Sequence, residues 1–272
     1  MNWLRVTKKN PCPVCGKPDW CGVSADGTMA ICMRRPSPHP ARNGGSLHIL
    51  SDPIPKYSLP PPSPPRKPKI AVLYFWEKWR RKTDPYELED FADALGVDAC
   101  ALDRIGAARA RNAWVFPMRN GAGQIVGIRF RGDDGGKWAL RGSAEGLFFD
   151  ATAPDDRTAI ICEGPTDTAA VMTLGYYAVG RPSCRGAVQH TKDLLKRQHI
   201  KRAVIVSDND EIDPHTGRRP GQSGAAALAA QLSGILTKII TPPAKDIRQA
   251  VAGGLSRTAF ETLLSVTQWR DN

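Results

Sequence analysis

Two short apolar runs, each followed at once by carboxylate side chains, constrain this chain more than any other feature. Residues 158–162 precede Glu163, and residues 203–206 lead to Asp208 and Asp210. Such runs are typical of buried parallel strands, whose carboxyl ends meet at one rim of an open α/β sheet. An Asp after a strand is often only a helix cap, but repetition on successive strands favours a shared site for Mg²⁺ or Mn²⁺. We therefore expect an α/β fold with a parallel sheet and a metal site at its rim.

Length and composition indicate the cellular compartment of the protein. The sequence has 272 residues, of which 41% are hydrophobic. It contains no apolar run long enough to cross a membrane, and its first residues lack the apolar segment of a signal peptide. We expect a cytoplasmic protein with no membrane partner.

Four of the seven cysteines lie within the first 32 residues. Cys12, Cys15, Cys21 and Cys32 follow the spacing C-x2-C-x5-C-x10-C. In a reducing compartment this crowding indicates a metal site rather than disulfides. We expect a zinc ribbon with four thiolate ligands, although His48 could replace Cys21 as the third ligand.

Positive charge is concentrated at the N-terminus. Residues 1–69 carry 11 Lys or Arg against 3 Asp or Glu, which is +8 of the total +11. A basic module on a nearly neutral body is typical of proteins that bind a polyanion, although a solvated basic face is the alternative. We divide the chain into a zinc ribbon (1–50), a proline-rich linker (51–69), a basic subdomain (70–156) and an α/β domain (157–272).

The basic subdomain begins with a helical pattern over residues 70–110. Residues 113–131 then predict a β-hairpin that turns at Asn120-Gly121. Its second strand places Arg129 and Arg131 on one face. The positive side chains of Lys137 and Arg141 follow closely in sequence. This basic face is either solvated or a binding surface.

The acidic patterns resemble the TOPRIM domain of primases, type IA and type II topoisomerases and some nucleases. The resemblance covers residues 157–252 and rests on the EGxxD and DxD patterns. It implies catalytic roles for the acidic side chains of these patterns, namely Glu163, Asp167, Asp208 and Asp210. Asp208 and Asp210 are the leading magnesium ligands. Glu163 is a ligand or a general base, and Asp167 supports the ligands or faces the helix dipole.

Three further segments resemble DnaG-type primases of bacteria, phages and plasmids. The cysteine pattern resembles their zinc-binding module, and the stretch from Phe116 to Arg131, with Lys137 after it, resembles the basic motif that precedes TOPRIM. Lys245 and Asp246 resemble the Lys-Asp that follows the last core strand. The resemblance implies that these basic residues face template and nucleotide. Arg181 and Lys245 either contact phosphates or form structural ion pairs.

The resemblance implies a DNA primase of a phage, plasmid or other mobile element. Such an enzyme makes short RNA primers on single-stranded DNA from NTPs by metal-dependent nucleotidyl transfer. One alternative is a TOPRIM nuclease or topoisomerase, and another is a zinc-dependent DNA-binding protein without catalysis. The sequence has no P-loop pattern, so we expect any replicative helicase partner to act in trans.

Overall fold

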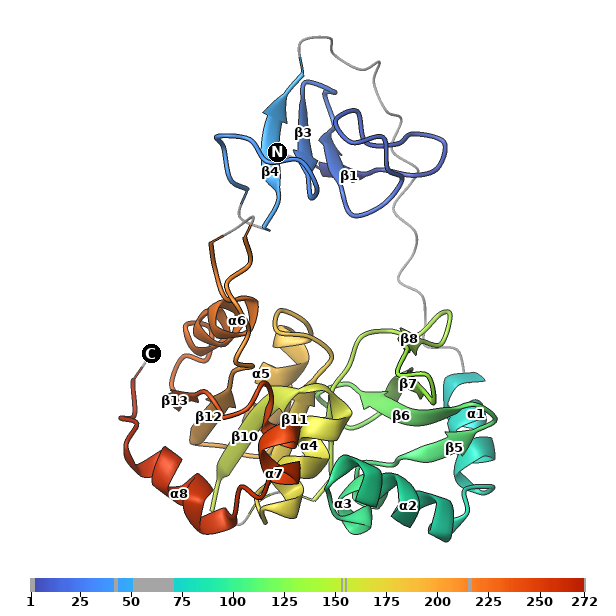
Figure 1. Ribbon diagram of the computed structural model, residues 1–272, viewed down its shortest axis with the longest axis vertical. Coiled ribbons are helices and arrows are strands. Elements are labelled where there is room, and N and C mark those ends of the chain that lie inside the picture. The colour runs from blue at the N-terminus through green and yellow to red at the C-terminus, as the bar shows by residue number, and fades with distance from the viewer. Residues whose placement is uncertain are drawn as a thin grey trace. The chain divides into compact units, whose positions relative to one another are not determined.

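The computed structural model describes residues 3–41, 44–50, 71–152, 154, 156–214 and 217–271 (Figure 1). The proline-rich linker expected over 51–69 lies outside the described residues. The chain packs as two compact units. The N-terminal unit comprises Met1–Arg66 and Ile212–Arg218, and the main unit comprises Lys67–Glu211 and Arg219–Asn272. The four domain boundaries drawn from the sequence stay a prediction. Among the described helices, none is long and apolar enough to cross a membrane.

The N-terminal unit contains a small antiparallel sheet in the order β1-β2-β3-β4. Its strands are β1 (Trp3–Arg5), β2 (Gly22–Ser24), β3 (Met29–Cys32) and β4 (Ser46–Ile49). The Asp26 carboxylate accepts the Thr28 N–H in the β2–β3 turn, where Gly27 has φ 73°. Three of the six buried residues in the core of this unit are cysteines. So small an apolar core does not stabilise a fold by itself.

The main unit begins with a mixed half that combines helices and an antiparallel sheet in the order β5-β6-β7-β8. Its elements are α1 (Ala71–Arg80), α2 (Pro85–Leu95), α3 (Ala99–Arg104), β5 (Ala108–Ala110), β6 (Ala113–Arg119), β7 (Ile125–Gly132) and β8 (Lys137–Ala139). Asp84 caps α2 by accepting the Tyr86 N–H, and Gly96 ends it with φ 69°. The helical pattern expected over residues 70–110 is confirmed as far as Arg104, whereas residues 108–110 form the strand β5.

Helices cover both faces of the central strand β6. Trp114, Phe116 and Met118 pack in the large core with α2 and α3. Val115, which points to the opposite face, packs in a smaller cluster with Val72 of α1. This double coverage explains why β6 is a nearly continuous apolar run instead of an alternating one.

The β6–β7 hairpin turns later than the sequence indicates. The connection spans residues 120–124, and the glycine with positive φ is Gly123, at 87°, rather than Gly121. The Asn120 side chain accepts N–H groups of Ala122 and Gln124, which widens the loop. A Cβ on Gly121 would lie 2.4 Å from the Asp193 Cβ of helix α5 (Val188–Arg197). The glycine at 121 therefore serves close packing. The predicted hairpin is confirmed, but its loop extends beyond Asn120-Gly121 to residue 124.

The second half of the main unit, the parallel-sheet half, has five strands in the order β13-β12-β10-β11-β9. Its elements are β9 (Phe148–Phe149), β10 (Thr158–Glu163), α4 (Gly164–Thr173), β11 (Ala178–Arg181), α5 (Val188–Arg197), β12 (Arg202–Val206), α6 (Pro220–Ala229), β13 (Leu236–Ile240), α7 (Ile247–Ala252) and α8 (Arg257–Ser265). Strands β10 to β13 are parallel, and β9 runs antiparallel beside β11. The α/β fold class is confirmed.

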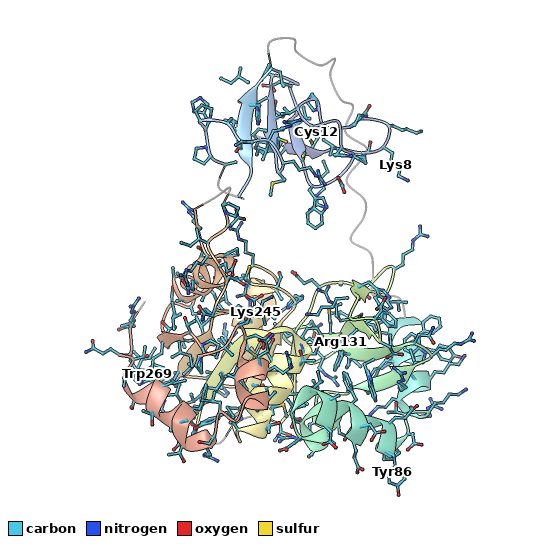
Figure 2. The ribbon with its side chains drawn as sticks, viewed as in Figure 1. Lys8, Cys12, Tyr86, Arg131, Lys245 and Trp269 are labelled. Atoms are coloured by element: carbon cyan, nitrogen blue, oxygen red, sulfur yellow. The ribbon has the colours of Figure 1, made fainter. Side chains whose placement is uncertain are left out.

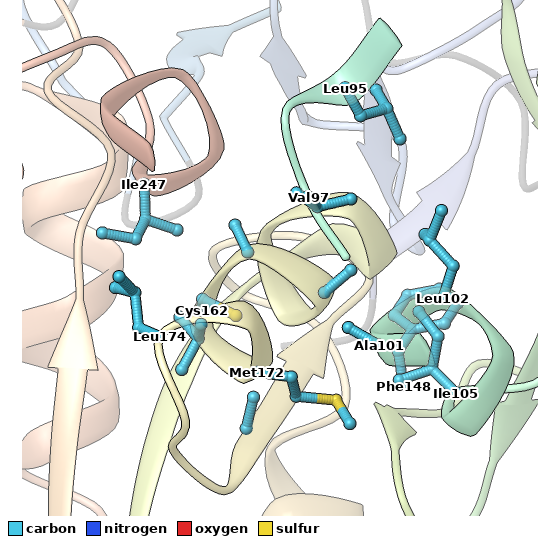
Figure 3. Close-up of a cluster of buried hydrophobic side chains, with 14 of the residues drawn as sticks. Leu95, Val97, Ala101, Leu102, Ile105, Phe148, Cys162, Met172, Leu174 and Ile247 are labelled. Carbon is cyan, nitrogen blue, oxygen red and sulfur yellow. The ribbon is translucent and has the colours of Figure 1, made fainter. Parts of the chain in front are cut away.

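Alternate residues of β10 enter different cores on the two faces of the sheet. Ile160 and Cys162 face α4 and α7, whereas Ala159 and Ile161 face α5 and α6. The first core continues into the mixed half. Figure 3 shows Leu102 and Phe148 in the same buried cluster as Met172 and Ile247. One hydrophobic core thus joins the two halves of the main unit.

Candidate active site and zinc site

A cavity of about 320 Å³ lies at the carboxyl ends of the parallel strands, between the two halves of the main unit. One wall is acidic and comes from the parallel-sheet half. Its carboxylates are those of Glu163, Asp167, Asp208, Asp210 and Asp246. The three carboxylates expected to share a rim, those of Glu163, Asp208 and Asp210, therefore line one cavity, and Asp167 and Asp246 line it with them.

Backbone contacts between remote segments fix the loop that carries Asp208 and Asp210. Directly after β12, the Ser207 N–H donates to the Ile240 carbonyl, 2.9 Å away, and the Asn209 N–H donates to the Lys245 carbonyl at 2.8 Å. Asp210 Oδ2 accepts the Gly221 N–H, 2.8 Å away, in the first turn of α6. The loop is thus held before any ligand binds, which is what a precise metal site requires.

The carboxylates of the acidic wall are crowded together, and the nearby cations offset their burial and mutual repulsion only in part. Burial, and then the nearby Asp208 carboxylate, raises the pKa of Glu163 to about 7. Burial, and then Asp210, raises the pKa of Asp208 to about 6. Such shifts mean that the ionised forms repel one another in a poorly solvated place. A divalent cation would relieve that repulsion, so the donor set fits Mg²⁺ or Mn²⁺.

Asp167 has a structural contact as well as a place on the wall. It lies in the first turn of α4, is 9% exposed, and accepts the Arg248 N–H with Oδ1 at 3.1 Å. Burial, and then the Asp246 carboxylate, raises its pKa to about 8. Asp167 therefore ties α4 to the start of α7. This contact supports a positioning role behind the other carboxylates.

The facing wall is basic. Arg129 and Arg131 reach it from β7 and Lys137 from β8, while Lys245 belongs to the parallel-sheet half. Figure 2 shows Arg131 and Lys245 on the two halves of the main unit. Both Lys245 and Lys137 act to lower the pKa of Asp208, although burial outweighs them. The cavity thus places cations opposite carboxylates, an arrangement suited to a phosphate-bearing ligand held through a metal ion.

Two of the basic residues singled out in the sequence do not line this cavity. Arg181 is 3% exposed, and its Nε donates to the Gly186 carbonyl at 2.9 Å. Its charge lowers the pKa of Glu163, though less than burial raises it. These contacts favour the structural alternative for Arg181. Arg141 is exposed in a turn beyond β8. A contact of either residue with template or phosphate stays a prediction.

Two positions that the sequence analysis did not single out hold the acidic wall in place. A Cβ on Gly221 would lie 3.0 Å from both the N and the O of Asp208, so any side chain at this position would displace the loop by a few tenths of an ångström. Arg248 supplies the N–H to Asp167, and its Nη2 lies 3.9 Å from Asp246 Oδ1. The Pro220-Gly221 pair signals a helix start, but only the tertiary fold brings it to Asp210.

The four N-terminal cysteines meet in the N-terminal unit. The Sγ atoms of Cys12, Cys15, Cys21 and Cys32 all lie within 4.8 Å of one another. Within the described parts of the chain, no other group of potential ligands is so compact, and the cavity carboxylates are spread more widely. Four thiols at this separation are the donor set of a structural zinc ion.

Backbone N–H groups are aimed at the sulfur atoms, as expected for thiolate ligands. Met33 N lies 3.4 Å from Cys21 Sγ, and Arg35 N lies 3.3 Å from Cys32 Sγ. His48, the alternative to Cys21, instead places Nε2 3.0 Å from the Arg35 carbonyl. The structure thus brings Cys21 into the cluster and leaves His48 outside it.

Comparisons with known proteins agree with this architecture. No protein-family model matches the chain, and no curated protein matches it. Solved structures do match, with TM-scores of 0.50 to 0.56 for the three described next.

The Aquifex aeolicus primase, comprising zinc-binding and RNA polymerase domains, has a TM-score of 0.56 and 14% identity over 74% of this chain and 60% of that one. The E. coli primase catalytic core has a TM-score of 0.54 and 15% identity over 72% and 79% of the two chains. A DnaG primase catalytic domain bound to single-stranded DNA has a TM-score of 0.50 and 17% identity over 66% and 71%. The chain therefore has the fold of the DnaG-type primase catalytic core.

Proposed function

We propose that this protein is a DNA primase that makes short RNA primers on single-stranded DNA. The observation that carries the proposal is the cavity of the main unit, where partly buried carboxylates face a basic wall at the carboxyl ends of a parallel sheet. The primase-like fold supports it, and one of the similar domains is bound to single-stranded DNA. The TOPRIM assignment of the parallel-sheet half belongs to the same proposal.

The acidic wall is where we place the chemistry. Asp208 and Asp210 would hold Mg²⁺ or Mn²⁺, with Glu163 beside them as a further ligand or as the acceptor of the hydroxyl proton. The bound cation would make a 3′-hydroxyl a better nucleophile and stabilise charge on the departing pyrophosphate. Asp167 and Arg248 hold the start of α4 against α7, and Asp246 begins α7 by accepting the Gln249 N–H at 2.7 Å.

The basic wall would orient the polyanionic substrates. Arg129 and Arg131 alternate with buried Ile128 and Phe130 along β7, so both guanidinium groups are directed to one face by a strand whose other face is packed. We assign them, with Lys137 and Lys245, to the phosphates of the incoming NTP and of the template. Such fixed cations favour a phosphate chain that enters the cavity and reaches the carboxylates.

The zinc-bearing module would supply the other part of template binding. Its basic charge would attract DNA phosphates. The thiolate cluster, formed by Cys12, Cys15, Cys21 and Cys32, would hold its short strands together through the bound zinc ion. A replicative helicase is the expected partner, because a primase needs single-stranded template. The assignment to a phage, plasmid or other mobile element stays a prediction from the sequence pattern.

One assay tests the proposed reaction. The full chain is incubated with circular single-stranded DNA, labelled NTPs and Mg²⁺, beside a preparation of Asp208→Asn purified identically. We expect labelled oligoribonucleotides from the original protein and none from the variant, which also excludes a contaminating polymerase. Nicked DNA would indicate a TOPRIM nuclease or topoisomerase instead. Bound but unchanged DNA would indicate a binding protein without catalysis.

A second measurement decides the role of Glu163. In Glu163→Gln, loss of a metal ligand raises the Mg²⁺ concentration needed for half-maximal synthesis. Loss of a proton acceptor leaves that concentration unchanged and lowers the maximal rate.

A further inference from the structure

Trp20 combines two unusual properties in the N-terminal unit. Its side chain is 75% exposed, and its backbone has φ 65°, in the left-handed region. An exposed tryptophan loses the benefit of burying a large apolar ring. A bulky residue with positive φ is a genuine conformational outlier. Glycine would fit this backbone without strain, so the presence of tryptophan calls for a role of the indole itself.

The surrounding contacts hold Trp20 in this conformation. Arg34 Nη1 donates to the Asp19 carbonyl at 2.9 Å, and Arg34 Nη2 pairs with Asp19 Oδ1 at 2.7 Å. On the other side, the Cys21 N–H donates to the same carbonyl at 2.8 Å, and Cys21 is buried in the thiolate cluster. Both neighbours of Trp20 are therefore anchored. Strain that is retained in this way is characteristic of functional positions.

The charges close to Trp20 indicate what the ring would contact. Lys17, Arg34 and Arg35 are exposed beside the thiolate cluster, and Asp19, the neighbouring acid, is paired with Arg34. An exposed aromatic ring in a unit with exposed cations suits a single-stranded nucleic acid, because unpaired bases stack on aromatic side chains while their phosphates meet Lys and Arg. A protein partner would be expected to cover a larger apolar patch with fewer charges.

We propose that Trp20 is a stacking platform for an unpaired base of the single-stranded template. The inference deepens the proposed function and rests on it. The four-cysteine cluster and the Arg34–Asp19 pair hold the backbone that carries the indole, so little backbone freedom would be lost on binding. Because paired bases are already stacked on one another, the contact also distinguishes single-stranded from duplex DNA.

Binding of the full chain to labelled single-stranded DNA tests the platform. Trp20→Gly should weaken binding about 5- to 150-fold, the range expected for loss of one base–aromatic stack. Trp20→Phe should retain most of the affinity of the original protein, because phenylalanine also offers an aromatic face. Ile49→Ala is the matched control, because Ile49 is apolar, equally exposed at 75%, and in the same unit. That variant should bind as the original protein does, and duplex binding should not change in any of the three.

Salt dependence and stability separate stacking from other roles. Trp20→Gly should keep the original slope of affinity against salt concentration, since no counterion release is lost, whereas Arg35→Gln should reduce that slope by about one. Zinc content should not change in Trp20→Gly. Its melting temperature should equal or exceed the original, because glycine relieves the left-handed strain.

Unchanged single-strand affinity in Trp20→Gly would overturn the inference, and so would loss of zinc or a lowered melting temperature, which would indicate a packing role. Failure of the proposed function can be distinguished from failure of the stacking inference. If the original protein binds single-stranded DNA through Trp20 but makes no primers, the primase proposal is wrong and the stacking inference stands. If it makes primers and Trp20→Gly binds equally well, only the stacking inference is wrong.

Discussion

At the scale of single residues, the acidic wall is built at the expense of stability. Glu163 and Asp208 are partly buried next to other carboxylates, and each has a raised pKa. In the folded protein without a divalent cation, their ionised forms repel one another. Replacing one of them by its amide should therefore remove function and relieve strain together, as is common where a site is preorganised for a ligand.

Asp208→Asn should abolish primer synthesis, because an amide is a poor substitute for an anionic ligand. Without Mg²⁺ at pH 8, it should also stabilise the fold by about 1 kcal/mol, since a partly buried charge is removed. Denaturant unfolding and the primer assay measure the two effects. Asp93→Asn, at an exposed position of α2, is the control and should change neither. Full synthesis by Asp208→Asn would contradict the metal assignment.

The same carboxylates predict how stability depends on pH. The pKa values of Asp208, Glu163 and Asp167 are raised to about 6, 7 and 8 from ordinary values of 3.8 and 4.5. A raised pKa contributes stability that is fully present below the ordinary value and is lost as pH rises through the folded value.

Protein dialysed free of Mg²⁺ but retaining zinc should therefore lose stability between pH 5 and pH 8. Added Mg²⁺ should restore more stability at pH 8 than at pH 5.5, because it binds the ionised carboxylates. Unfolding titrations at several pH values check both effects. A stability that rises steadily across this window without Mg²⁺ would be inconsistent with the acidic wall.

At the scale of elements, sequence patterns correctly predicted features that depend on neighbouring residues alone, such as the direction of side chains along a strand. The alternation of Arg129 and Arg131 with apolar neighbours placed both arginines on one face of β7, and the structure has them there. The hairpin turn was misplaced because Gly121 packs against α5, a contact that no local pattern reports. Arg248 was missed for the same reason, since its contact with Asp167 joins positions 81 residues apart.

Gly221→Ala tests how closely α6 must approach the acidic loop. A Cβ there would lie 3.0 Å from backbone atoms of Asp208, so the loop has to shift by a few tenths of an ångström. We expect primer synthesis to fall by up to about 100-fold, because small displacements of reacting groups have large effects on rate. Gln222→Ala, on the same helix turn, serves as the control. Equal rates for both variants would show that the loop tolerates the displacement.

The zinc ligands can be separated by substitution. Purified protein should contain about one zinc ion per chain, as a four-ligand site requires. Cys21→Ser and Cys32→Ser should lose it, whereas His48→Ala should keep it. Cys100→Ser, at an exposed cysteine outside the cluster, controls for thiol loss. Zinc retained in Cys21→Ser but lost in His48→Ala would restore the histidine alternative.

At the scale of the whole molecule, we propose that the two separately packed units have different tasks, with template binding in the N-terminal unit and the chemistry in the main unit. Charge counts alone placed the basic excess at the N-terminus, and pattern reasoning placed the carboxylates elsewhere. The sequence could not tell that Arg181 would be buried, because that depends on how the loop after β11 folds back onto it. The strands that carry the carboxylates could be predicted from the sequence, whereas the burial of each side chain could not.

A fragment that starts at Ile70 should fold and keep the acidic cavity, since the packing of the main unit does not include the N-terminal module. It should bind template more weakly and with a shallower salt dependence, because the basic module is gone. The rate of primer initiation should fall more than the rate of extension of a supplied primer, because a supplied primer already provides the 3′-hydroxyl. Equal initiation by fragment and full chain at one salt concentration would assign the module another task.

The hydrophobic core that joins the two halves of the main unit has a mechanical consequence. Phe148, Leu102 and Met172 belong to one buried cluster that spans both halves (Figure 3). A close-packed interior does not deform continuously. We therefore expect the distance between the acidic and basic walls to stay constant, with no hinge between the two halves of the main unit. The width of the cavity would then be set during folding, so a substrate would have to fit a fixed opening, and only exposed side chains such as Lys137 and Lys245 could adjust to it.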